Sequence, residues 1–105
     1  MNLNKVFLFG NITRDPETKT LQTGGKVVNF SVATNRFYTD SANEKHEVTE
    51  FHSIVVFGKL AEVAEQYLKI KTPVLIEGRI QTRSWSTPEG TKQYRTEIVA
   101  ENIQF

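Results

Sequence analysis

The sequence predicts an all-β fold: one domain in which five strands close into a small barrel, with a single helix between the third and fourth strands. Three observations support this prediction. Most segments alternate apolar and polar residues with a period of two, one segment alone has the period of a helix, and turn-forming residues separate the segments. This order matches the five-stranded Greek-key barrel called the OB-fold. Closing the sheet also removes the unpaired edges that an open sheet would expose.

The first expected strand, residues 4–12, contains the apolar run Val6-Phe7-Leu8-Phe9. A strand that is apolar at both alternating positions is typical of one covered on both faces. In so small a domain, the core covers one face of this strand and a partner subunit would cover the other. We therefore expect Val6 and Leu8 at an interface between subunits.

The second and third expected strands, residues 26–36 and 48–58, flank a polar segment at 38–47 that we interpret as a long exposed hairpin loop. Turn residues at 15–17 and 24–25 precede the second strand. The inward positions of the second strand are Val28, Phe30 and Val32. In the third strand, one face carries His52, Ile54 and Val56, and the other carries Phe51, Ser53, Val55 and Phe57. One face of the third strand therefore carries rings beyond what the core needs.

The period changes after the third strand, where residues 60–68 fit an amphipathic helix of about three turns. Its expected apolar face is Leu60, Val63, Ala64, Tyr67 and Leu68. Residues 73–86 form the fourth strand, with Val74, Ile76, Gly78 and Ile80 on one face. Thr87-Pro88-Glu89-Gly90 fits a type I turn, with proline second and glycine fourth. The fifth strand, residues 93–103, is expected to bury Ile98 and Ala100.

Composition excludes several classes of protein. The chain has no cysteine, which excludes disulfide frameworks and thiolate metal sites. No apolar run is long enough to cross a membrane, and the N-terminus lacks the features of a signal peptide. With 13 basic and 12 acidic residues the formal net charge is +1. Any field that attracts nucleic acid must therefore come from local sorting of charge within this single domain, residues 1–105.

The sole tryptophan is expected on the polar face of the fourth strand. Alternation places Trp85 beside Arg79 and Arg83, opposite to Ile76. A ring among guanidinium groups on an open sheet suits single-stranded nucleic acid, because bases stack on the ring and phosphates pair with the charges. The alternative is an interface tryptophan that packs on a neighbouring chain.

Other rings and cations belong to the same candidate nucleic-acid site. The aromatic candidates are Tyr38, Phe51, Phe57 and Trp85. The cationic candidates are Arg36, Lys59, Lys69, Arg79 and Arg83. Each stacked base would contribute about 1–3 kcal/mol, and the cations would pair with phosphates and release counterions. The alternative role of Phe57 is core or subunit packing, and that of Lys59 and Lys69 is a solvated surface charge.

No pattern indicates catalysis or metal binding. His46 lies in the polar loop and is expected to be solvated, whereas His52 lies on the inward face of the third strand, in the core or an interface. The spacing of these histidines fits no metal site. The chain has no nucleophile elbow, phosphate-binding loop or paired-carboxylate motif. We therefore expect neither a cofactor nor enzymatic activity.

Five segments, in order from about Asn4 to Phe105, resemble the bacterial-type single-stranded DNA-binding protein family. They are NKVFLFGNITRDPE, GGKVVNFSVATN, TEFHSIVVFGKLAEVAEQYL, VLIEGRIQTRSW and YRTEIVAENIQF. The resemblance implies an OB-fold that forms a homotetramer and binds single-stranded DNA without strong sequence preference. It also implies a cytoplasmic, nucleoid-associated role in replication, recombination and repair.

The resemblance assigns roles to individual positions. The aromatic residues of the family match Tyr38, Phe51, Phe57 and Trp85, and its basic residues match Lys59 and Arg83. Tryptophan is common at the first two of these rings, which implies a weaker stacking surface here. Ser84 stands where a basic residue is frequent, which removes one phosphate contact. His52 matches a histidine at the subunit interface of the family.

One departure from the family concerns its C-terminus. Members usually continue into a flexible linker rich in Gly, Pro and Gln and an acidic tip that recruits other proteins, whereas this chain ends at Phe105 with neither. We therefore do not expect, from the resemblance alone, that this chain recruits other proteins as family members do. In the expected mechanism, hairpins at residues 40–45 and 86–92 close over the bound strand.

Three alternatives belong to other functional classes. The first is a dimeric OB adaptor of primosome assembly or of a phage, which would bind a partner protein first and single strands weakly. The second is an RNA-binding OB domain. The third is a hydrolase or nuclease, for which no acidic metal cluster is visible in the sequence.

Overall fold

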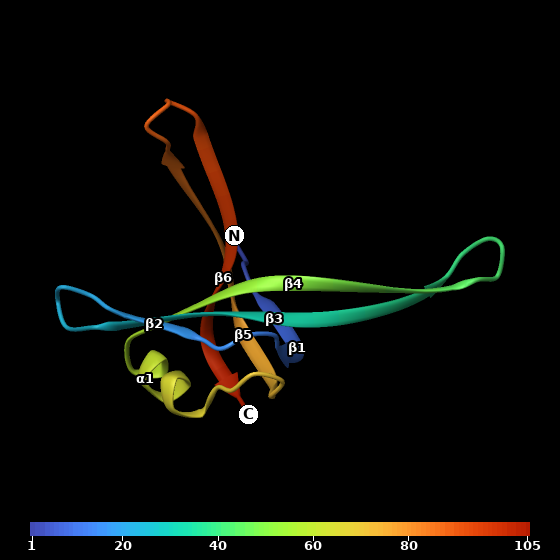
Figure 1. The fold of residues 1–105 in the computed structure, drawn as a ribbon, viewed down its shortest axis with the longest axis horizontal. Coiled ribbons are helices and arrows are strands. Elements are labelled where there is room, and N and C mark those ends of the chain that lie inside the picture. The colour runs from blue at the N-terminus through green and yellow to red at the C-terminus, as the bar shows by residue number, and fades with distance from the viewer.

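Six strands and one helix make up the protein, and the computed structural model describes all of residues 1–105. The elements are β1 (Val6–Ile12), β2 (Glu17–Thr20), β3 (Lys26–Thr39), β4 (Lys45–Phe57), α1 (Gly58–Tyr67), β5 (Pro73–Ser86) and β6 (Lys92–Gln104) (Figure 1). The strands lie in the order β1-β5-β6-β4-β3-β2, and a further pairing of β1 with β3 closes the sheet. The five-stranded barrel with one helix before its last two strands is therefore confirmed, and β2 is an addition to it.

The segment between the first two predicted strands contains more structure than the expected turns. Within it, β2 pairs antiparallel with β3 from Glu17↔Asn29 to Thr20↔Lys26. All four side chains of β2 are exposed, so the segment lacks the apolar alternation by which a strand is recognised. Only its backbone pairing with β3 defines it as a strand.

The β3–β4 hairpin extends beyond both predicted strands. The two strands pair as far as Thr39↔Lys45, so the predicted loop of residues 38–47 shortens to residues 40–44. The outer part of the hairpin has solvent on both faces, and its polar sequence therefore resembles a loop. Asn43, with a φ of 63°, lies in the turn that joins the two strands.

The barrel interior is filled by the predicted inward side chains. The predicted side chains with almost no exposed area are Val28, Val32, Ile54, Val56, Val74 and Ile76, and Ile12, for which no inward position was predicted, joins them. Ile98 and Ala100 are buried as well, as predicted. Ile80, predicted on the same face, is instead 48% exposed, because β5 and β6 continue beyond the barrel as a two-stranded arm. A second buried group, Val27, Val55 and Val99, lies on the outer face of the sheet.

Two glycines allow the backbones of the barrel to approach closely. A Cβ at Gly10 would lie 2.2 Å from the carbonyl oxygen of Ala33, and a Cβ at Gly78 would lie 2.2 Å from that of Val99. No other residue fits at such a distance. The pairing register of β5 with β6 also shifts between Glu77 and Gly78. This irregularity lies where the arm leaves the barrel.

The helix α1 covers one end of the barrel with only part of its predicted apolar face. Its buried residues are Ala61 and Ala64, and Leu68 follows them. Val63 and Tyr67, predicted on the same face, are exposed instead, because the small alanine side chains face the barrel and let the helix approach it. The Tyr67 ring lies 5.8 Å from that of Phe105. At ten residues, α1 is too short to span a bilayer, and the fold has no other helix that could do so.

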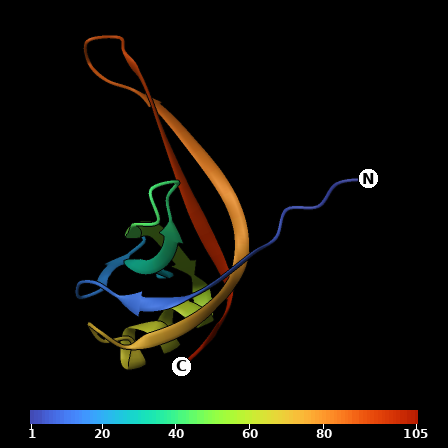
Figure 2. The same ribbon diagram turned by 90° about the vertical axis from the view of Figure 1, so that its right-hand side faces the viewer.

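Two hairpins project from the barrel in different directions (Figures 1 and 2). The β3–β4 hairpin reaches to the right of Figure 1, and the β5–β6 arm reaches upward. The predicted turn at residues 87–90 is confirmed by a hydrogen bond of 2.9 Å from Gly90 N to Thr87 O. Because of these projections, the molecule measures 56 × 39 × 34 Å.

Candidate nucleic-acid interface

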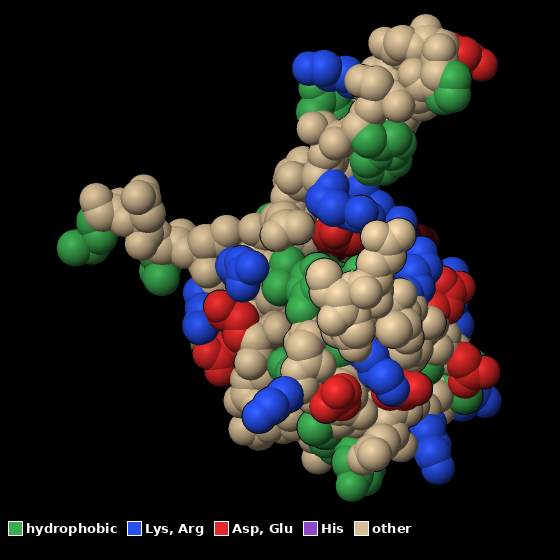
Figure 3. Space-filling model, turned by 90° about the vertical axis from the view of Figure 1, so that its left-hand side faces the viewer, with side chains coloured by type: hydrophobic (Ala, Val, Ile, Leu, Met, Phe, Trp, Pro, Cys, Tyr) green, Lys and Arg blue, Asp and Glu red, His purple; other side chains and the backbone are tan.

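An open hollow of about 320 Å³ lies on the outer face of the sheet, between β2–β3–β4 and the base of the β5–β6 arm. Its charged side chains are Arg14, Glu17, Lys19, Arg83, Arg95 and Glu97, and its aromatic ring is Phe57. We call this surface the cationic hollow. Figure 3 shows Lys and Arg side chains gathered where the arm leaves the barrel. Four basic and two acidic residues line the hollow. This surface is therefore more positive than the small net charge of the whole chain suggests.

A buried carboxylate holds Arg83 within the cationic hollow. Glu97 is only 5% exposed, and its carboxylate accepts hydrogen bonds from Arg83 Nε at 2.6 Å and from Nη2 at 3.5 Å. The Arg83 side chain remains half-exposed. Arg79, the other predicted cation of β5, pairs with Glu101 at 3.6 Å. Carboxylates of the same chain therefore partly neutralise two of the predicted phosphate contacts.

Three further cations of the hollow are not among the residues predicted from the sequence: Arg14, Lys19 and Arg95. Arg95 lies directly opposite Arg83 in the β5–β6 ladder, and its Nη2 donates to Ser53 Oγ at 3.1 Å. The predicted turn at 87–90 carried the necessary signal, because a hairpin closed there pairs positions 83 and 95. For Arg14 and Lys19 no such signal exists, since the pattern does not predict β2.

All four predicted rings are exposed, Tyr38 at 42%, and the other three share the outer side of the sheet. Phe51 is 67% exposed on β4, and Phe57 is 49% exposed at the end of the same strand, as alternation predicts. Trp85 is 47% exposed on the arm. It lies on the face that also carries Arg83 and Arg95. Flat rings and guanidinium groups therefore share one side of the sheet.

Tyr38, the fourth predicted ring, lies on the other side of the β3–β4 ladder from Phe51 and Phe57. Its cross-strand partner is His46, whose ring stacks on it with centroids 5.1 Å apart and 21° between the planes. The guanidinium carbon of Arg36 lies 5.3 Å from the centre of the Tyr38 ring. Side chains of the same hairpin therefore already contact this ring.

Two more exposed rings, Phe37 and Tyr94, are not among the predicted site residues. Phe37 lies on the Phe51 side of the β3–β4 ladder, one residue before Tyr38. Tyr94 lies on the face of the arm opposite to Trp85. Alternation along β3 would have identified Phe37, but the polar residues that follow suggest that the strand ends before it.

The structure does not bring the two predicted lysines together. Lys59 lies in the first turn of α1, two residues after Phe57, and is exposed. Lys69 belongs to the connection between α1 and β5, a segment that runs along the lower end of the molecule in Figure 1. Neither lysine lines the cationic hollow.

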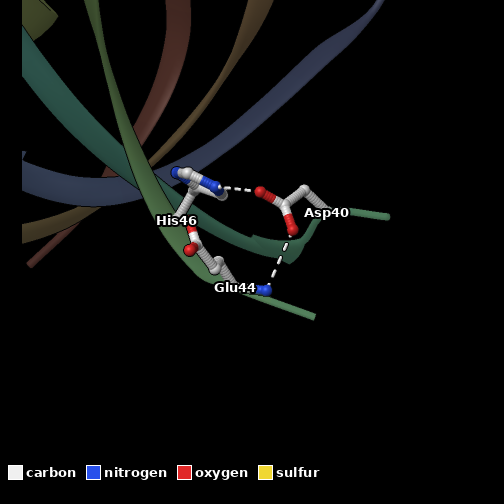
Figure 4. A group of neighbouring side chains, drawn as sticks. All are labelled: Asp40, Glu44 and His46. Carbon is white, nitrogen blue, oxygen red and sulfur yellow. Dashed lines mark hydrogen bonds and ion pairs between the residues drawn. The ribbon is translucent and has the colours of Figure 1, made fainter. Parts of the chain in front are cut away.

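A cluster of polar side chains braces the turn of the β3–β4 hairpin (Figure 4). His46, expected to be solvated, instead places its Nε2 2.7 Å from Asp40 Oδ2. Asp40 Oδ1 accepts hydrogen bonds from the backbone N–H groups of Ala42 and Glu44, each at 2.9 Å. The bond from the Glu44 amide and then the bond from His46 hold the pKa of Asp40 below its ordinary value of 3.8.

The same cluster contains side chains that can bind metals. Asp40, Glu44 and His46 each offer one ligand atom, and these atoms lie within 4.8 Å of one another. Both oxygens of Asp40, however, already accept hydrogen bonds from the turn. The bonding of the turn therefore accounts for this cluster without an ion.

The residues predicted for a subunit interface line a second hollow, of about 360 Å³, between β1, β4 and the arm. They are Val6, Leu8 and His52. Val6 and Leu8 are half-buried and pack against the core. Phe7 and Phe9 on the outer face of β1 are exposed in the single chain, so the cover of that face by a partner subunit stays a prediction.

A sequence profile of the Single-strand binding protein family matches residues 3–105 of this chain. This chain belongs to the single-strand binding protein family. Among its relatives, Single-stranded DNA-binding protein 1 of Chlorobaculum tepidum is 48% identical over 104 residues, which are 98% of this chain and 64% of the relative. This family member therefore spans less than two-thirds of the length of that relative.

Two solved structures of single-stranded DNA-binding proteins have the same architecture. The Plasmodium falciparum protein, in complex with single-stranded DNA, has a TM-score of 0.90 at 34% identity, over 99% of this chain and 93% of that chain. A deletion mutant of the Thermus aquaticus protein has a TM-score of 0.87 at 28% identity, over 97% of this chain and 49% of that chain. The predicted OB-fold and the predicted family are both confirmed.

Proposed function

We propose that this protein binds single-stranded DNA without sequence preference and protects it, and that it catalyses no reaction. One observation carries the proposal: in a member of the single-strand binding protein family, exposed flat rings lie beside a cationic hollow on one side of the sheet. Stacking on such rings is tolerant of sequence, because every base has a π face. The Plasmodium falciparum relative, which is complexed with single-stranded DNA, supports the same ligand here.

In the proposed mechanism, bases stack on Phe51, Phe57 and Trp85, which come from two different strands of the sheet. Each stacked base contributes about 1–3 kcal/mol. The family resemblance adds Tyr38 to this set. The arm that carries Trp85 and the β3–β4 hairpin would close over the strand once it occupies the hollow.

Phosphates pair with the basic side chains of the cationic hollow. Arg95 is exposed, and Arg83 remains half-exposed beside Glu97. The predicted cations outside the hollow would contact segments of the strand that enter or leave it. They are Arg36, Lys59, Lys69 and Arg79. Neutralising several phosphates releases counterions, so binding weakens as salt increases.

We propose that the protein forms a homotetramer in which β1 lies at a subunit interface. β1 exposes Phe7 and Phe9 on one face, and Val6 and Leu8 line the hollow beside it. Exposed apolar clusters of this kind are typical of protein contact surfaces. His52, half-buried with its Nε2 2.8 Å from Thr34 Oγ1, would lie in the same contact. Native mass spectrometry of the free protein would measure the subunit count.

The proposed cellular role follows from the ligand. A protein that coats exposed strands acts wherever the duplex is opened, in replication, recombination and repair. We therefore propose a cytoplasmic, nucleoid-associated location. Recruitment of other proteins forms no part of the proposal.

A fluorescence titration tests the proposed function directly. Trp85 is the sole indole and lies on the proposed binding face, so poly-thymidine should quench its emission at low salt. An equal length of poly-uridine as competitor separates a DNA-binding protein from an RNA-binding one. Absence of quenching and of any binding at low salt would contradict the proposal.

A pair of exposed rings provides a matched test of the stacking mechanism. Phe51→Ala should weaken binding of poly-thymidine by about 5- to 100-fold, which corresponds to the loss of one stacked base. Tyr67→Ala removes a ring of similar exposure from α1, which lies away from the outer face of the β3–β4 ladder, and should leave affinity unchanged. Equal effects of the two changes would contradict stacking on Phe51.

A further inference from the structure

We propose that Asn4 is a positioning residue for the nucleic-acid interface: its side chain joins the base of the β5–β6 arm to the N-terminal segment and so fixes the direction of the arm that carries Trp85. The inference rests on the proposed function and deepens it, because it names a group that orders the binding surface without touching the strand. Asn4 itself does not line the cationic hollow.

The β5–β6 arm has little support from the barrel beyond its base. β5 pairs with β1 only as far as Val6↔Gly78, and β6 pairs with β4 no closer to the arm than Ile54↔Ile98. Beyond these positions the two strands pair only with each other. A two-stranded ribbon without further cover is only marginally ordered by itself, so the contacts at its base decide its direction.

The Asn4 side chain adds one pair of hydrogen bonds to the end of the β1–β5 ladder. Its Nδ2 donates to the carbonyl oxygen of Ile80 at 2.8 Å, and its Oδ1 accepts from the Ile80 N–H at 2.9 Å. The register Val6↔Gly78, continued by two residues, also brings position 4 opposite to position 80. A carboxamide offers the donor and the acceptor of a peptide group, so the side chain here takes the place of a strand backbone. Figures 1 and 2 show the N-terminal segment beside the base of the arm.

Other contacts at the base of the arm use charged side chains. Arg95 Nη2 donates to Ser53 Oγ on β4 at 3.1 Å. Lys5 Nζ lies 2.7 Å from Glu77 Oε2. Salt screens exposed ion pairs, and a phosphate in the cationic hollow would compete with Ser53 for Arg95. The bonds of Asn4 are neutral and use no group that the strand needs, so we expect them to persist in salt and in the complex.

The contact at Ile80 controls a long lever. A strand rises about 3.3 Å per residue, so Trp85 lies about 17 Å further along the arm. A modest tilt at the base therefore moves the ring by several ångströms. Without the Asn4 contact, the arm would spend part of its time in directions unsuited to stacking, and the apparent affinity would fall with the fraction of competent molecules.

Two measurements on the free protein report the contact itself. In Asn4→Ala, the Ile80 amide should exchange with solvent at least about fivefold faster, because its acceptor is lost. The anisotropy of Trp85 emission should fall, because the arm moves more freely. Asn2→Ala removes the same kind of side chain from the exposed start of the chain and should change neither quantity.

Titration of a fluorescently labelled poly-thymidine tests the effect on binding. Asn4→Ala should weaken binding by about 3- to 10-fold, because binding must then order the arm without the two lost bonds. The slope of log K against log salt should stay the same, since no phosphate contact is removed. The loss should shrink in a Trp85→Ala background, where the arm has no ring to position. It should persist in a Phe51→Ala background, because that ring lies on β4.

The outcomes separate the role of Asn4 from the proposed function. If the unaltered protein binds poly-thymidine and Asn4→Ala binds equally well, the positioning role is wrong and single-strand binding stands. An equal loss in the Trp85→Ala and Phe51→Ala backgrounds also overturns it, because Asn4 would then not act through the arm. Unchanged exchange at Ile80 in Asn4→Ala would show that the contact does not order the arm. If the unaltered protein does not bind, the proposed function fails, and the positioning role fails with it.

Discussion

Glu97, on the outer face of the sheet, is the one ionisable side chain that the fold buries. A buried carboxylate without a partner would cost several kcal/mol of desolvation, and here Arg83 offsets this cost with a contact of 2.6 Å. The same contact reduces the positive field of the cationic hollow, because part of the Arg83 charge is directed at Glu97. The contact between Glu97 and Arg83 therefore stabilises the fold but lowers the expected affinity of the hollow for phosphate.

Glu97→Gln should make both effects visible. The change weakens a charge-assisted hydrogen bond and should lower the free energy of unfolding by about 1–3 kcal/mol. It also frees the charge of Arg83, so affinity for poly-thymidine at low salt should rise. Urea denaturation and the Trp85 titration measure the two quantities. Glu101→Gln, which alters only surface ion pairs of Lys5 and Arg79, should change stability by less than about 1 kcal/mol.

The turn of the β3–β4 hairpin is held by polar contacts rather than by a core. Asp40 receives two backbone amides and the His46 ring, and these bonds stabilise its charged form. Because the pKa of Asp40 is lowered in the folded chain, its contribution to order in the turn is present above the ordinary pKa of 3.8. The contribution is lost as pH falls through the lower, folded value.

The order of this turn should therefore decrease below about pH 4. Amide hydrogen exchange or NMR shifts of Ala42 and Glu44, followed from pH 7 to pH 2, measure the effect. In Asp40→Asn the acid transition at these two amides should disappear, since no carboxylate remains to be protonated. Retention of the same transition in the variant would assign it to another group.

The close approach of strands at Gly78 can be tested with a second glycine as control. Gly78→Ala would place a methyl group 2.2 Å from the Val99 carbonyl oxygen, so the backbone must shift, and stability should fall by about 1–3 kcal/mol or more. Gly25→Ala meets only side-chain atoms at 3.9 Å or beyond and should be nearly neutral. Urea denaturation at equal protein concentration compares them. Similar midpoints for the two variants would contradict the close-approach interpretation.

For the whole molecule, charge sorting matters more than total charge. A formal net charge of +1 provides little long-range attraction, yet the sheet gathers four basic side chains around one hollow. Arg14 lies just before β2 and Lys19 within it, whereas Arg83 and Arg95 come from the β5–β6 arm, far away in sequence. The salt dependence of binding should therefore depend on the number of cations in the hollow and not on the net charge of the chain.

Arg95→Met should reduce the slope of log K against log salt by about 0.7, the value for one phosphate of a single strand. Lys71→Met removes an equal charge from the α1–β5 connection, outside the hollow, and should leave the slope unchanged. Titrations at several salt concentrations measure both slopes. Equal slopes for the two variants would show that binding depends on total charge rather than on the hollow.

The order of strands and helix along the chain, and most of the core residues, could be predicted because they depend on local patterns. The face of β4 that carries Phe51 and Phe57 is recognisable from alternation, and so is the polar face that carries Trp85. The polar ends of the hairpins could not be predicted in the same way. Outside the barrel both faces of a strand meet solvent, so apolar and polar residues no longer alternate and the pattern does not reveal the strand. For this reason Phe37 is not among the predicted site residues.

The sequence by itself determined the fold class, the family and the side of each barrel strand that faces the core, because burial of one face imposes a period on neighbouring residues. Only the tertiary structure decided which charges meet. The contact of Arg83 with Glu97, the arrival of Lys19 beside them and the separation of Tyr38 from Phe51 depend on ladder register and barrel closure. The barrel closure and the β2–β3 pairing that place Lys19 there have no local signal in the chain, whereas the two hairpin registers follow from where each turn closes.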